Sequence, residues 1–587
     1  MLHVIWNPED KERLNREGRD CYAPYLKEIL NDMGIGYQLW NCVDWIDVRP
    51  QGVSIVIGGI EHDGWGGACR AYVESGNSLL TIGGTYGLEK LLGVKTEGCI
   101  TEGWIEWGDA PIAESLSSSF HCFGAQFLEG VDSDIRQYGT LTRRNGVRTT
   151  SPALTLVQRG QGLAAMLNFD LMKTVTLIQQ GMPVIVDGVV APDGTGGIDE
   201  GILKTDDGSV LDWVRDRAAV EQTPFYLYPI IDEMRCLLNR LLVHLTHHAG
   251  ERIVQKWFWP SGITAIGHIS HDTDGNDAGQ AEMMLNWLKR ADVRSTWCII
   301  MPGYEQKIND RIVADGHEVA LHYNAMGEEI AESCWSEAHF QVQHTMLQAQ
   351  FPGRPIVSNK NHYLRWEGDV QFYHWCERAG IKVEQSKGGT KRGNKGFLAG
   401  TCHPYAPMSG AGDGNRCFDL ISMPTLAWDP PDADRCTELE AFALLERCRD
   451  VYGVTHFLLH PAAMGLMTEG AMGEVLVKLA EHGRNCGMEW WTSEEIWRWR
   501  QTRNQVRMEV RRNADDALTV TIASEEDVCG LTVLLSVGKS EELAIRQSQG
   551  CSVNGIRLVS RFGCAYMEFV LDVRQGTGEI VFAKAEK

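Results

Sequence analysis

The sequence predicts an α/β protein of several domains, and three observations lead to that prediction. Residues 1–250 alternate short apolar runs with amphipathic helical patterns, which favours an open parallel sheet. Residues 251–502 repeat such β/α units, which favours a barrel of parallel strands. Residues 503–587 carry short strand patterns and no helical pattern, which is typical of a small β-sandwich. A chain of 587 residues has room for roughly two to four domains.

In the first domain, residues 3–6, 54–59 and 79–84 read as short buried strands. Between the first two, apolar residues spaced i, i+3, i+4 and i+7 from Leu26 indicate a helix with one apolar face, which Gly34 ends. Strands that alternate with helices in this way are expected to lie parallel in one sheet.

This first domain resembles the class I glutamine amidotransferase-like, flavodoxin-like folds, and the resemblance implies a doubly wound parallel sheet. The nucleophile turn of those enzymes reads Gly-x-Cys-x-Gly, whereas residues 83–87 read Gly-Gly-Thr-Tyr-Gly. A threonine hydroxyl needs a dedicated base before it becomes a nucleophile. We therefore expect this domain, which lacks the nucleophilic cysteine, to serve structure or ligand recognition.

The central domain repeats strand-like and helical patterns. Apolar strand-like runs occupy residues 262–266, 295–300, 319–321, 381–383 and 457–459. A helix with apolar residues from Ala281 to Leu288 follows the first of these runs. In a barrel of parallel strands, the functional residues gather at the C-terminal ends of the strands.

The last domain shows alternation of apolar and polar residues. Val506, Met508 and Val510 alternate with charged residues, and Asn554-Gly555 is a two-residue signal for a β-hairpin. These patterns predict the β-sandwich of residues 503–587.

The strongest chemical signal is residues 271–275, His-Asp-Thr-Asp-Gly, shortly after the first strand of the central domain. Side chains two residues apart on extended backbone point to the same side, so Asp272 and Asp274 can face one small volume. Two close carboxylates repel each other, so such a pair usually has a cation beside it or shares a proton. The pair therefore predicts a metal with a general base beside it, and a solvated Asp-x-Asp-Gly loop is the alternative.

Three further clusters follow in chain order, and their ranges are 315–324 with His322, 360–366 with His362, and 455–461 with His460. Together with residues 271–275, they resemble the ordered motifs of the NodB-type polysaccharide deacetylases, carbohydrate esterase family 4. The resemblance covers roughly residues 260–500, under half of the chain. It implies a distorted, seven-stranded (β/α)7 barrel and a metal-dependent deacetylase.

The resemblance also implies roles for individual residues. Asp274 and His322 are expected to bind one divalent metal ion, with His362 as the candidate third ligand. Asp272 is expected to act as general base, and His460 as the general acid that protonates the leaving amine. Zinc is the first expectation for the ion, with nickel, cobalt or manganese as alternatives.

Two positions depart from the family pattern. The family has a second metal histidine four residues after His322, and here that position is Met326, whose thioether is a poor ligand for such ions. For this reason His362 is the candidate replacement. The family arginine that orients the base is replaced by Lys360, which keeps the charge but loses the planar fork. Arg365 is expected to take over part of that role.

Substrate contacts are expected from aromatic and polar residues near the motifs. Tyr363, Trp366, His403 and Tyr405 are the candidates, with His403 and Tyr405 expected at the mouth of the barrel. The Tyr363 hydroxyl or a backbone N–H is expected to stabilise the oxyanion. Glu384 stands near the place of a family aspartate.

Composition limits the partners and the compartment. A formal charge of −23 argues against nucleic acid and anionic membranes as partners. The chain has 17 cysteines without a Cys-x-x-Cys pair. The simplest interpretation is that they are reduced thiols in a cytosolic protein. Neither a signal peptide nor an apolar run of about 18 residues is recognisable, so we expect a soluble, cytoplasmic chain without membrane association. A homo-oligomer is compatible with the sequence.

These observations predict a metal-dependent hydrolase that removes an acyl group, expected to be N-acetyl, from a saccharide. Two alternatives stay open. One is an amidohydrolase that acts on a small non-sugar amide with the same barrel. The other is a catalytically silent carbohydrate-binding or assembly protein, which the replacements Met326 and Lys360 suggest.

Overall fold

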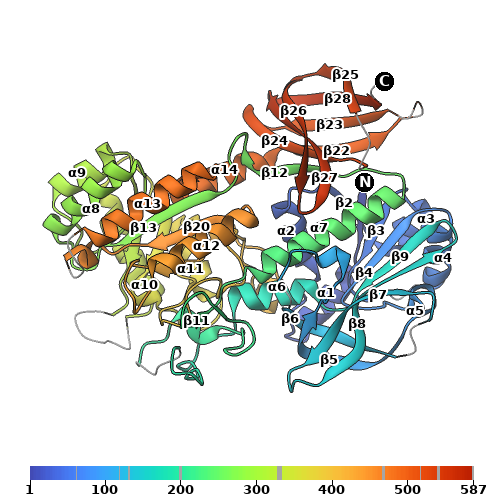
Figure 1. Cartoon of the computed structure of the whole chain (residues 1–587), viewed down its shortest axis with the longest axis horizontal. Helices are drawn as coiled ribbons and strands as arrows, with labels where there is room; N and C mark the ends of the chain where they lie inside the picture. Colours follow the sequence, from blue (N-terminus) through green and yellow to red (C-terminus); the bar gives the residue numbers. More distant parts are fainter. Residues whose placement is uncertain are drawn as a thin grey trace.

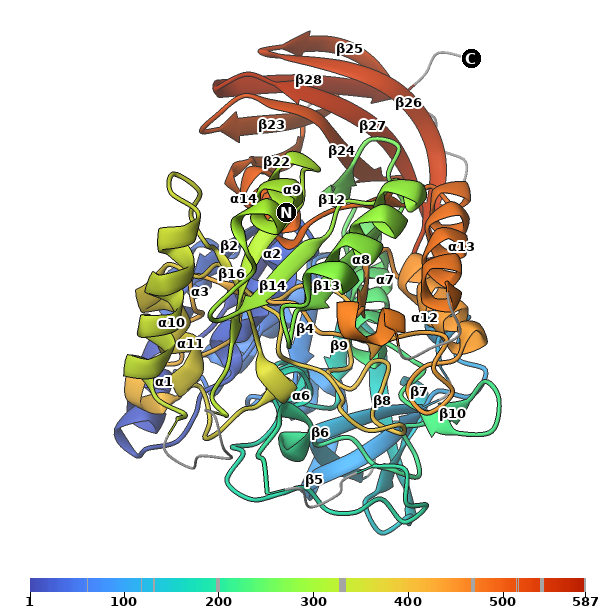
Figure 2. The same cartoon turned by 90° about the vertical axis from the view of Figure 1, so that its left-hand side faces the viewer.

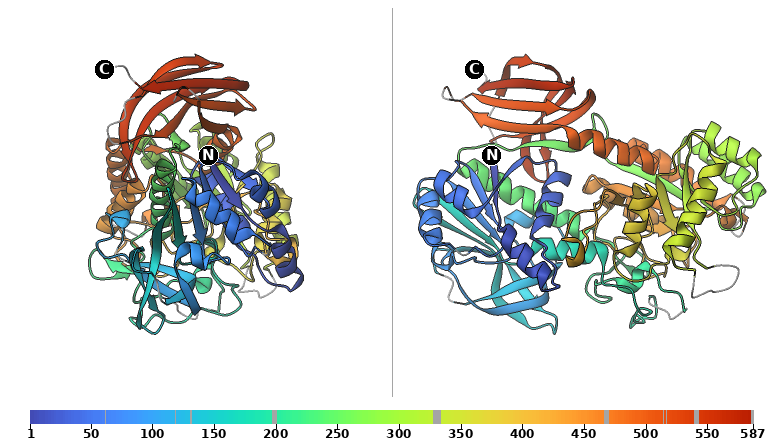
Figure 3. Two further views of the ribbon diagram at one scale, coloured as in Figure 1. Left: turned by 90° about the vertical axis from the view of Figure 1, so that its right-hand side faces the viewer. Right: turned by 180° about the vertical axis from the view of Figure 1, so that it is seen from behind.

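The computed structural model describes residues 1–584 except 61, 118, 130–131, 197–200, 327–333, 466–469, 514, 516 and 539–542. Three regions are distinct in Figure 1: an N-terminal sheet with helices, a central curled sheet with helices, and the antiparallel sheets of the C-terminal segment. The N-terminus lies beside the C-terminal sheets (Figure 3), although the two segments are at opposite ends of the sequence. In the part of the chain that the structure describes, no helix combines the length and the apolar character that a membrane crossing needs.

A nine-stranded sheet forms the N-terminal region. In spatial order its strands are β2 (Tyr37–Trp40), β1 (Leu2–Ile5), β3 (Val53–Val56), β4 (Ser78–Ile82), β9 (Gly162–Leu167), β8 (Arg148–Arg159), β7 (Arg136–Arg143), β5 (Lys95–Glu106) and β6 (Ser119–Glu129). The first five are parallel, as the sequence predicts. The remaining four join antiparallel, because residues 95–159 form long adjoining strands without intervening α-helices. The expected parallel sheet is therefore only the first part of a mixed sheet.

Seven helices belong to this region: α1 (Pro8–Arg16), α2 (Leu26–Asp32), α3 (Cys42–Val48), α4 (Trp65–Glu74), α5 (Glu89–Leu92), α6 (Leu171–Gln180) and α7 (Ile230–His248). Helix α2 is the one predicted from Leu26, and Gly34 follows it with a φ of 71°. Helix α7 is buried along most of its length. Its Asn239 Nδ2 donates a hydrogen bond to Tyr566 Oη of the C-terminal segment at 2.7 Å, so α7 joins two regions of the molecule.

The central region is a parallel sheet that curls on itself (Figure 2). In spatial order its strands are β18 (Ile421–Ser422), β17 (Val383–Glu384), β16 (Ser358–Asn361), β15 (Glu318–Tyr323), β14 (Thr296–Ile300), β13 (Ile266–Asp272), β20 (Val454–Leu458) and β19 (Ala427–Trp428), and β21 (Glu489–Trp490) also pairs with β13. Within the described residues, β18 and β19 do not pair, so the barrel is incomplete. The predicted parallel β/α repeat is present, with nine strands in the sheet where seven were expected.

The helices of the central region are α8 (Ala278–Ala291), α9 (Gln306–Ala314), α10 (Glu337–Gln350), α11 (Gln371–Ala379), α12 (Glu438–Asp450), α13 (Ala471–Asn485) and α14 (Ser493–Gln505). Helix α8 buries the apolar face that the sequence predicts, from Ala281 to Leu288. Asp277 caps its first turn by accepting a hydrogen bond from the backbone N–H of Gln280 at 2.8 Å. The turn that carries Asp272 and Asp274 is therefore held between a buried strand and a capped helix.

Two four-stranded antiparallel sheets form the C-terminal region. Their orders are β12 (Val254–Pro260), β24 (Val528–Ser536), β27 (Cys564–Val573), β26 (Cys551–Arg561), and β22 (Arg507–Arg512), β23 (Leu518–Ser524), β28 (Gly576–Lys584), β25 (Leu543–Gln549). Side chains of both sheets share one apolar core. Strand β12, which the sequence assigned to the barrel domain, pairs instead with β24.

The predicted hairpin turn at Asn554-Gly555 is wrong. Both residues lie inside strand β26, where the pairing with β27 shifts between Asn554 and Arg557. Gly555 has a φ of 60°, but Asn554 does not have a positive φ. A type I′ hairpin turn needs a positive φ at both residues, so the pair fits a β-bulge and not a strand reversal. The sequence signal for a positive φ was correct, but the chain uses that freedom within a strand.

Residues 181–229 connect the first domain to α7 and contain β10 (Ala218–Ala219) and β11 (Pro224–Phe225). This connection lies against the central region, because Val184 pairs with Gly368 and Lys204 with Arg365 in isolated bridges. A segment outside the β/α repeat thus reaches the C-terminal edge of the central sheet.

Candidate metal centre and active site

The main predicted site residues lie at or just past the C-terminal ends of parallel strands. Strand β13 ends at Asp272, His322 is the next-to-last residue of β15, and His362 directly follows β16. His460 comes two residues after the end of β20. Because all these strands are parallel, their ends meet at one edge of the sheet.

The turn after β13 holds Asp274 in a backbone conformation that non-glycine residues rarely adopt, with a φ of 28°. The backbone N–H of Thr273 donates to the Cys298 carbonyl at 3.2 Å, and the Thr273 hydroxyl donates to Asn276 Oδ1 at 2.8 Å. Such a conformation costs about 1–3 kcal/mol and persists where the surroundings impose it, often at functional sites. Here it places the Asp274 carboxylate opposite two histidines.

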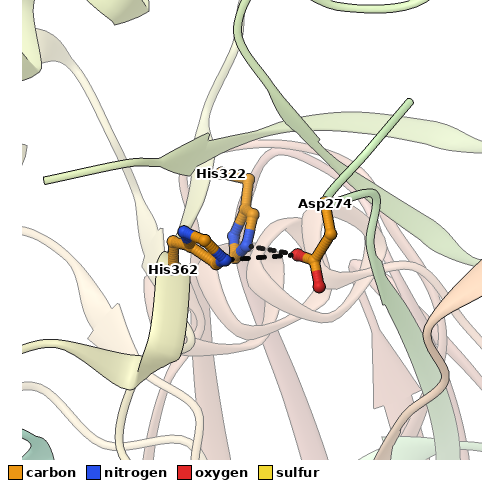
Figure 4. Close-up of side chains that lie close together, drawn as sticks. All are labelled: Asp274, His322 and His362. Carbon is orange, nitrogen blue, oxygen red and sulfur yellow. Dashed lines mark ion pairs between the residues drawn. The ribbon is translucent and has the colours of Figure 1, made fainter. Parts of the chain in front are cut away.

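Asp274, His322 and His362 converge on one point (Figure 4). Asp274 Oδ1 lies 3.4 Å from His322 Nε2 and 3.6 Å from His362 Nε2, and one ligand atom from each residue lies within 4.8 Å of the others. His322 Nε2 is also 3.8 Å from Asp272 Oδ2. Two imidazole nitrogens and a carboxylate are a ligand set that suits a divalent ion and leaves positions open for water and substrate.

The second nitrogen of each imidazole fixes which nitrogen faces Asp274. His322 Nδ1 lies 2.9 Å from the Lys360 carbonyl oxygen, and His362 Nδ1 lies 3.2 Å from Asn324 Oδ1. Because these oxygens only accept hydrogen bonds, each Nδ1 carries the hydrogen. Both Nε2 atoms are therefore unprotonated in the neutral rings and present a lone pair to the site.

Buried atoms without partners support a cation at this point. Asp272 Oδ1, Asp274 Oδ1 and His322 Nε2 are buried and have no hydrogen-bond partner among the described residues. A buried polar atom without a partner costs free energy, so it usually has a ligand or water beside it. These residues therefore fit a divalent ion.

The electrostatics of the three candidate ligands agree with a cation site. Burial raises the pKa of Asp274, but the close approach of His322 and the charges of nearby histidines bring it well below its usual range. Burial and the neighbouring His322 lower the pKa of His362 to about 3, so this ring is neutral near pH 7. Burial lowers the pKa of His322, yet the carboxylates of Asp272 and Asp274 raise it above its ordinary value. The same carboxylates would attract a metal ion.

His460 is paired with Asp429, which the sequence analysis did not single out. Asp429 is buried and accepts hydrogen bonds from the His460 backbone N–H at 2.7 Å and from Nδ1 at 2.8 Å. Burial lowers the pKa of His460, but Asp429 and the more distant carboxylates of the site raise it to about 9. Glu384 does not fill this role, because its carboxylate accepts from the backbone of Ser386. The local signal for Asp429 was the run Trp-Asp-Pro-Pro after a short strand.

Lys360 and Arg365 make their described contacts away from the predicted base. The Lys360 ammonium donates to Ser270 Oγ at 2.6 Å. Ser270 lies two residues before Asp272, the last residue of β13. Arg365 donates to Glu367 and approaches the Met326 sulfur at 3.6 Å. Met326 therefore packs beside a guanidinium, and the orienting roles of Lys360 and Arg365 stay predictions.

Three predicted substrate contacts fall in the interior instead of the site. Trp366, His403 and Tyr405 are all buried. His403 Nε2 bonds to the Val451 carbonyl at 2.8 Å, and the Tyr405 hydroxyl donates to the Gln179 carbonyl of α6 at 2.6 Å. The prediction that His403 and Tyr405 line the mouth of the barrel is wrong, because both side chains are buried and bond to backbone carbonyls in the interior.

A pocket of about 620 Å³ opens over the candidate ligands. Asp272, Asp274, His362 and His460 line it, and Tyr363 lies at its wall. Tyr363 is 51% exposed, and its ring is 4.4 Å from that of His362. Of the aromatic residues predicted to contact substrate, Tyr363 is thus the one that reaches the pocket.

A buried ion pair joins two residues that are close in sequence to pocket-lining residues 389–392 and 434–435. Lys395 Nζ lies 2.6 Å from Glu440 Oε2 and donates to the Arg435 carbonyl at 3.0 Å. Lys395→Met leaves the buried Glu440 charge unpaired, so we expect the free energy of unfolding to fall by about 3–5 kcal/mol. Urea unfolding followed by tryptophan fluorescence measures this loss.

The matched control is Lys478→Met, because Lys478 pairs with Glu438 of the same helix α12 in an exposed position. This control should lower the free energy of unfolding by no more than about 1 kcal/mol. Adding Glu440→Gln to Lys395→Met should recover part of the loss. Equal losses in Lys395→Met and the control would contradict the importance of the buried pair.

Comparison with known proteins gives structural likenesses only. No family model matches the chain, and no curated protein matches its sequence. Among solved structures, a protein from Mycobacterium smegmatis described as a polysaccharide deacetylase is 17% identical, with a TM-score of 0.31, and the match covers 42% of this chain and 93% of that chain. A family 4 acetyl xylan esterase from Clostridium thermocellum, in complex with a cobalt ion, is 16% identical, with a TM-score of 0.26 and coverages of 40% and 91%. The peptidoglycan deacetylase PdaC from Bacillus subtilis is 10% identical, with a TM-score of 0.25 and coverages of 40% and 94%.

Likenesses of this size do not establish a family for the chain.

Proposed function

We propose that this protein is a metal-dependent hydrolase that removes an acyl group, N-acetyl in the first instance, from a saccharide. The observation that carries the proposal is the convergence of Asp274, His322 and His362 beside a pocket that is lined by Asp272, Asp274, His362 and His460. Residues from four separate segments supply candidate metal ligands, a base and an acid at one sheet edge. This combination suits metal-assisted hydrolysis of an acyl bond.

Each residue has a role that its surroundings support. Asp274, His322 and His362 would hold the metal through one carboxylate oxygen and two Nε2 atoms. When bound, a divalent ion supplies a Lewis acid that lowers the pKa of water and polarises a carbonyl group. Zinc suits such a nitrogen and oxygen ligand set, and nickel, cobalt or manganese are alternatives.

The proton transfers are assigned to the two residues beside the ligands. Asp272 has a buried oxygen without a hydrogen-bond partner among the described residues, so it can accept the proton of attacking water. His460 keeps its proton near pH 7, because its pKa is about 9, and can donate it to the leaving amine. Tyr363 lines the pocket and is placed to contact the sugar or the oxyanion.

The test combines metal content with acyl release. We expect the purified protein to hold about one equivalent of divalent metal, measured by elemental mass spectrometry, and to release acetate from N-acetylhexosamine oligosaccharides. Acetylated hexosamines are compared with ureides and small non-sugar amides. Turnover of only the latter would replace the saccharide with a small amide as substrate. Absence of both metal and turnover would overturn the proposal in favour of a silent binding protein.

A further inference from the structure

One wall of the pocket is rich in positive charge, although the chain as a whole carries a formal charge of −23. The cationic residues that line the pocket are Lys204, Lys391, Arg392 and Arg435, and the carboxylates are Asp272, Asp274 and Asp434. Asp272 and Asp274 belong to the catalytic and metal-binding set proposed above. The other charged residues of the lining, which are available to contact the part of a substrate away from the acyl group, are therefore mainly cationic.

Three of the four cations come from two segments that are far apart in the sequence. Lys204 comes from residues 181–229, which connect α6 to α7, and Lys391 and Arg392 come from the loop after β17. Lys204 is 5% exposed, and its ammonium lies 5.7 Å from the centre of the Tyr363 ring. Tyr363 is the neighbour of His362, so the wall is adjacent to the metal centre.

A buried aspartate ties the two segments together. Asp206 Oδ2 accepts hydrogen bonds from Thr390 N and Thr390 Oγ1, both at 2.9 Å, and from Asn394 Nδ2 at 2.7 Å. The Thr205 hydroxyl adds a hydrogen bond to the Gly388 carbonyl at 2.9 Å. These buried hydrogen bonds hold the two cation-bearing segments in fixed positions. Such support prearranges a binding site for a charged group.

The four cations are not equivalent. Arg435 pairs with Asp429 and also lies 3.4 Å from Asp432, so its charge stabilises the partner of His460. Arg392 is exposed and has no ion-pair partner among the residues that the structure describes. Lys204 interacts electrostatically with Asp206 and Asp207, and Lys391 interacts in the same way with Asp187. These two lysines and Arg392 are the pocket cations that are not paired with Asp429.

We propose that the substrate carries an anionic group, a carboxylate or a phosphate, which Lys204, Lys391 and Arg392 bind while the acylated amine lies at the metal centre. This inference rests on the proposed function and specifies its substrate class as an acidic saccharide. Ammonium and guanidinium groups bind carboxylate and phosphate through charge-assisted hydrogen bonds. A cationic wall inside an otherwise acidic protein also attracts such substrates selectively.

The experiment compares three N-acetylated sugars that differ in charge: N-acetylglucosamine, N-acetylglucosamine 6-phosphate and N-acetylmuramic acid. Equilibrium binding by calorimetry and acetate release are measured separately on the metal-loaded full chain. The double variant Lys391→Met, Arg392→Met should lower the preference for the preferred acidic sugar over the neutral sugar by about tenfold or more. Lys204→Met should lower it in the same direction.

The control variant is Lys289→Met, which removes an exposed charge on α8 at another pocket and should leave the preference unchanged. Bound metal and circular dichroism verify that each variant is intact. The two acidic sugars distinguish a phosphate site from a carboxylate site. Equal binding of neutral and acidic sugars by the wild type, or an acidic preference that survives the double variant, would overturn the inference.

Failure of the proposed function gives a different result. A preference in binding that depends on Lys391 and Arg392, without acetate release from any sugar, would keep the acidic ligand and reject the hydrolase. Acetate release at equal rates from neutral and acidic sugars would keep the hydrolase and reject the acidic substrate.

Discussion

Asp274→Asn is expected to abolish stoichiometric metal binding and to lower kcat/KM for acyl hydrolysis by about a thousandfold or more. The substitution replaces the carboxylate whose Oδ1 faces both His322 Nε2 and His362 Nε2 with a neutral amide. Asparagine tolerates the positive φ of this position better than most residues, so the turn after β13 should persist. The loss then reports on the ligand and not on the backbone.

The measurement pairs elemental mass spectrometry with initial rates of acetate release at several metal concentrations. The matched control is Asp310→Asn, which removes an exposed carboxylate on α9. His322→Gln should reproduce the loss of metal, because it removes a second ligand atom of the same group. A variant of Asp274 that retained one equivalent of tightly bound metal would contradict the assigned centre.

The parts of the site that the sequence predicted are those with a local signal. Asp272 and Asp274 are two residues apart at a strand end, and their spacing alone predicted that they share a volume. His322 and His362 follow other strands of a parallel sheet, so the order of the strands brings them to the same edge. The replacement of a family histidine by Met326 led to His362, and the structure places His362 at the centre.

The parts that the sequence missed depend on distant pairings. Asp429 meets His460 because β19 pairs with β20, and β19 is only two residues long. No periodicity is visible in so short a strand. Strand β12 falls within residues 251–502, which were assigned to the barrel, yet it pairs with β24 far along the chain. Such contacts follow from packing, which composition and spacing do not reveal.

The incorrect prediction that His403 and Tyr405 line the mouth of the barrel also arises from contacts between distant segments. His403 and Tyr405 lie in residues 401–405, a segment that was predicted to line the mouth of the barrel. In the structure this segment is covered by α6 and its neighbours, so the polar groups of both side chains are satisfied by backbone carbonyls. A connection between two domains, with Lys204 in it, occupies the pocket wall where those residues were expected.

Asp429→Asn is expected to move the alkaline limb of the pH–rate profile to lower pH and to lower kcat at pH 8 by about 10²-fold or more. In the wild type, Asp429 accepts a hydrogen bond from His460 Nδ1 and stabilises its protonated form, and the pKa of His460 is raised to about 9. Without the Asp429 charge, only the more distant carboxylates offset the effect of burial, so the pKa of His460 falls. A smaller fraction of His460 is then protonated and able to donate at pH 8. A bound metal cation repels the imidazolium, so the wild-type limb should lie at or below pH 9.

The sign of the effect separates a catalytic acid from a structural histidine. If His460 donates the proton, activity falls as pH rises through its pKa, and the variant loses activity first at the alkaline side. The raised pKa of His460 also contributes to the free energy of unfolding. This contribution is complete below pH 6.5, the ordinary histidine pKa, and disappears as the pH rises toward about 9. Profiles of kcat are therefore recorded together with urea unfolding at each pH.

The control Asp432→Asn removes a nearby carboxylate that pairs with Arg435 and should leave the alkaline limb of the pH–rate profile in place. An unchanged limb in Asp429→Asn would mean that another group supplies the proton to the leaving amine.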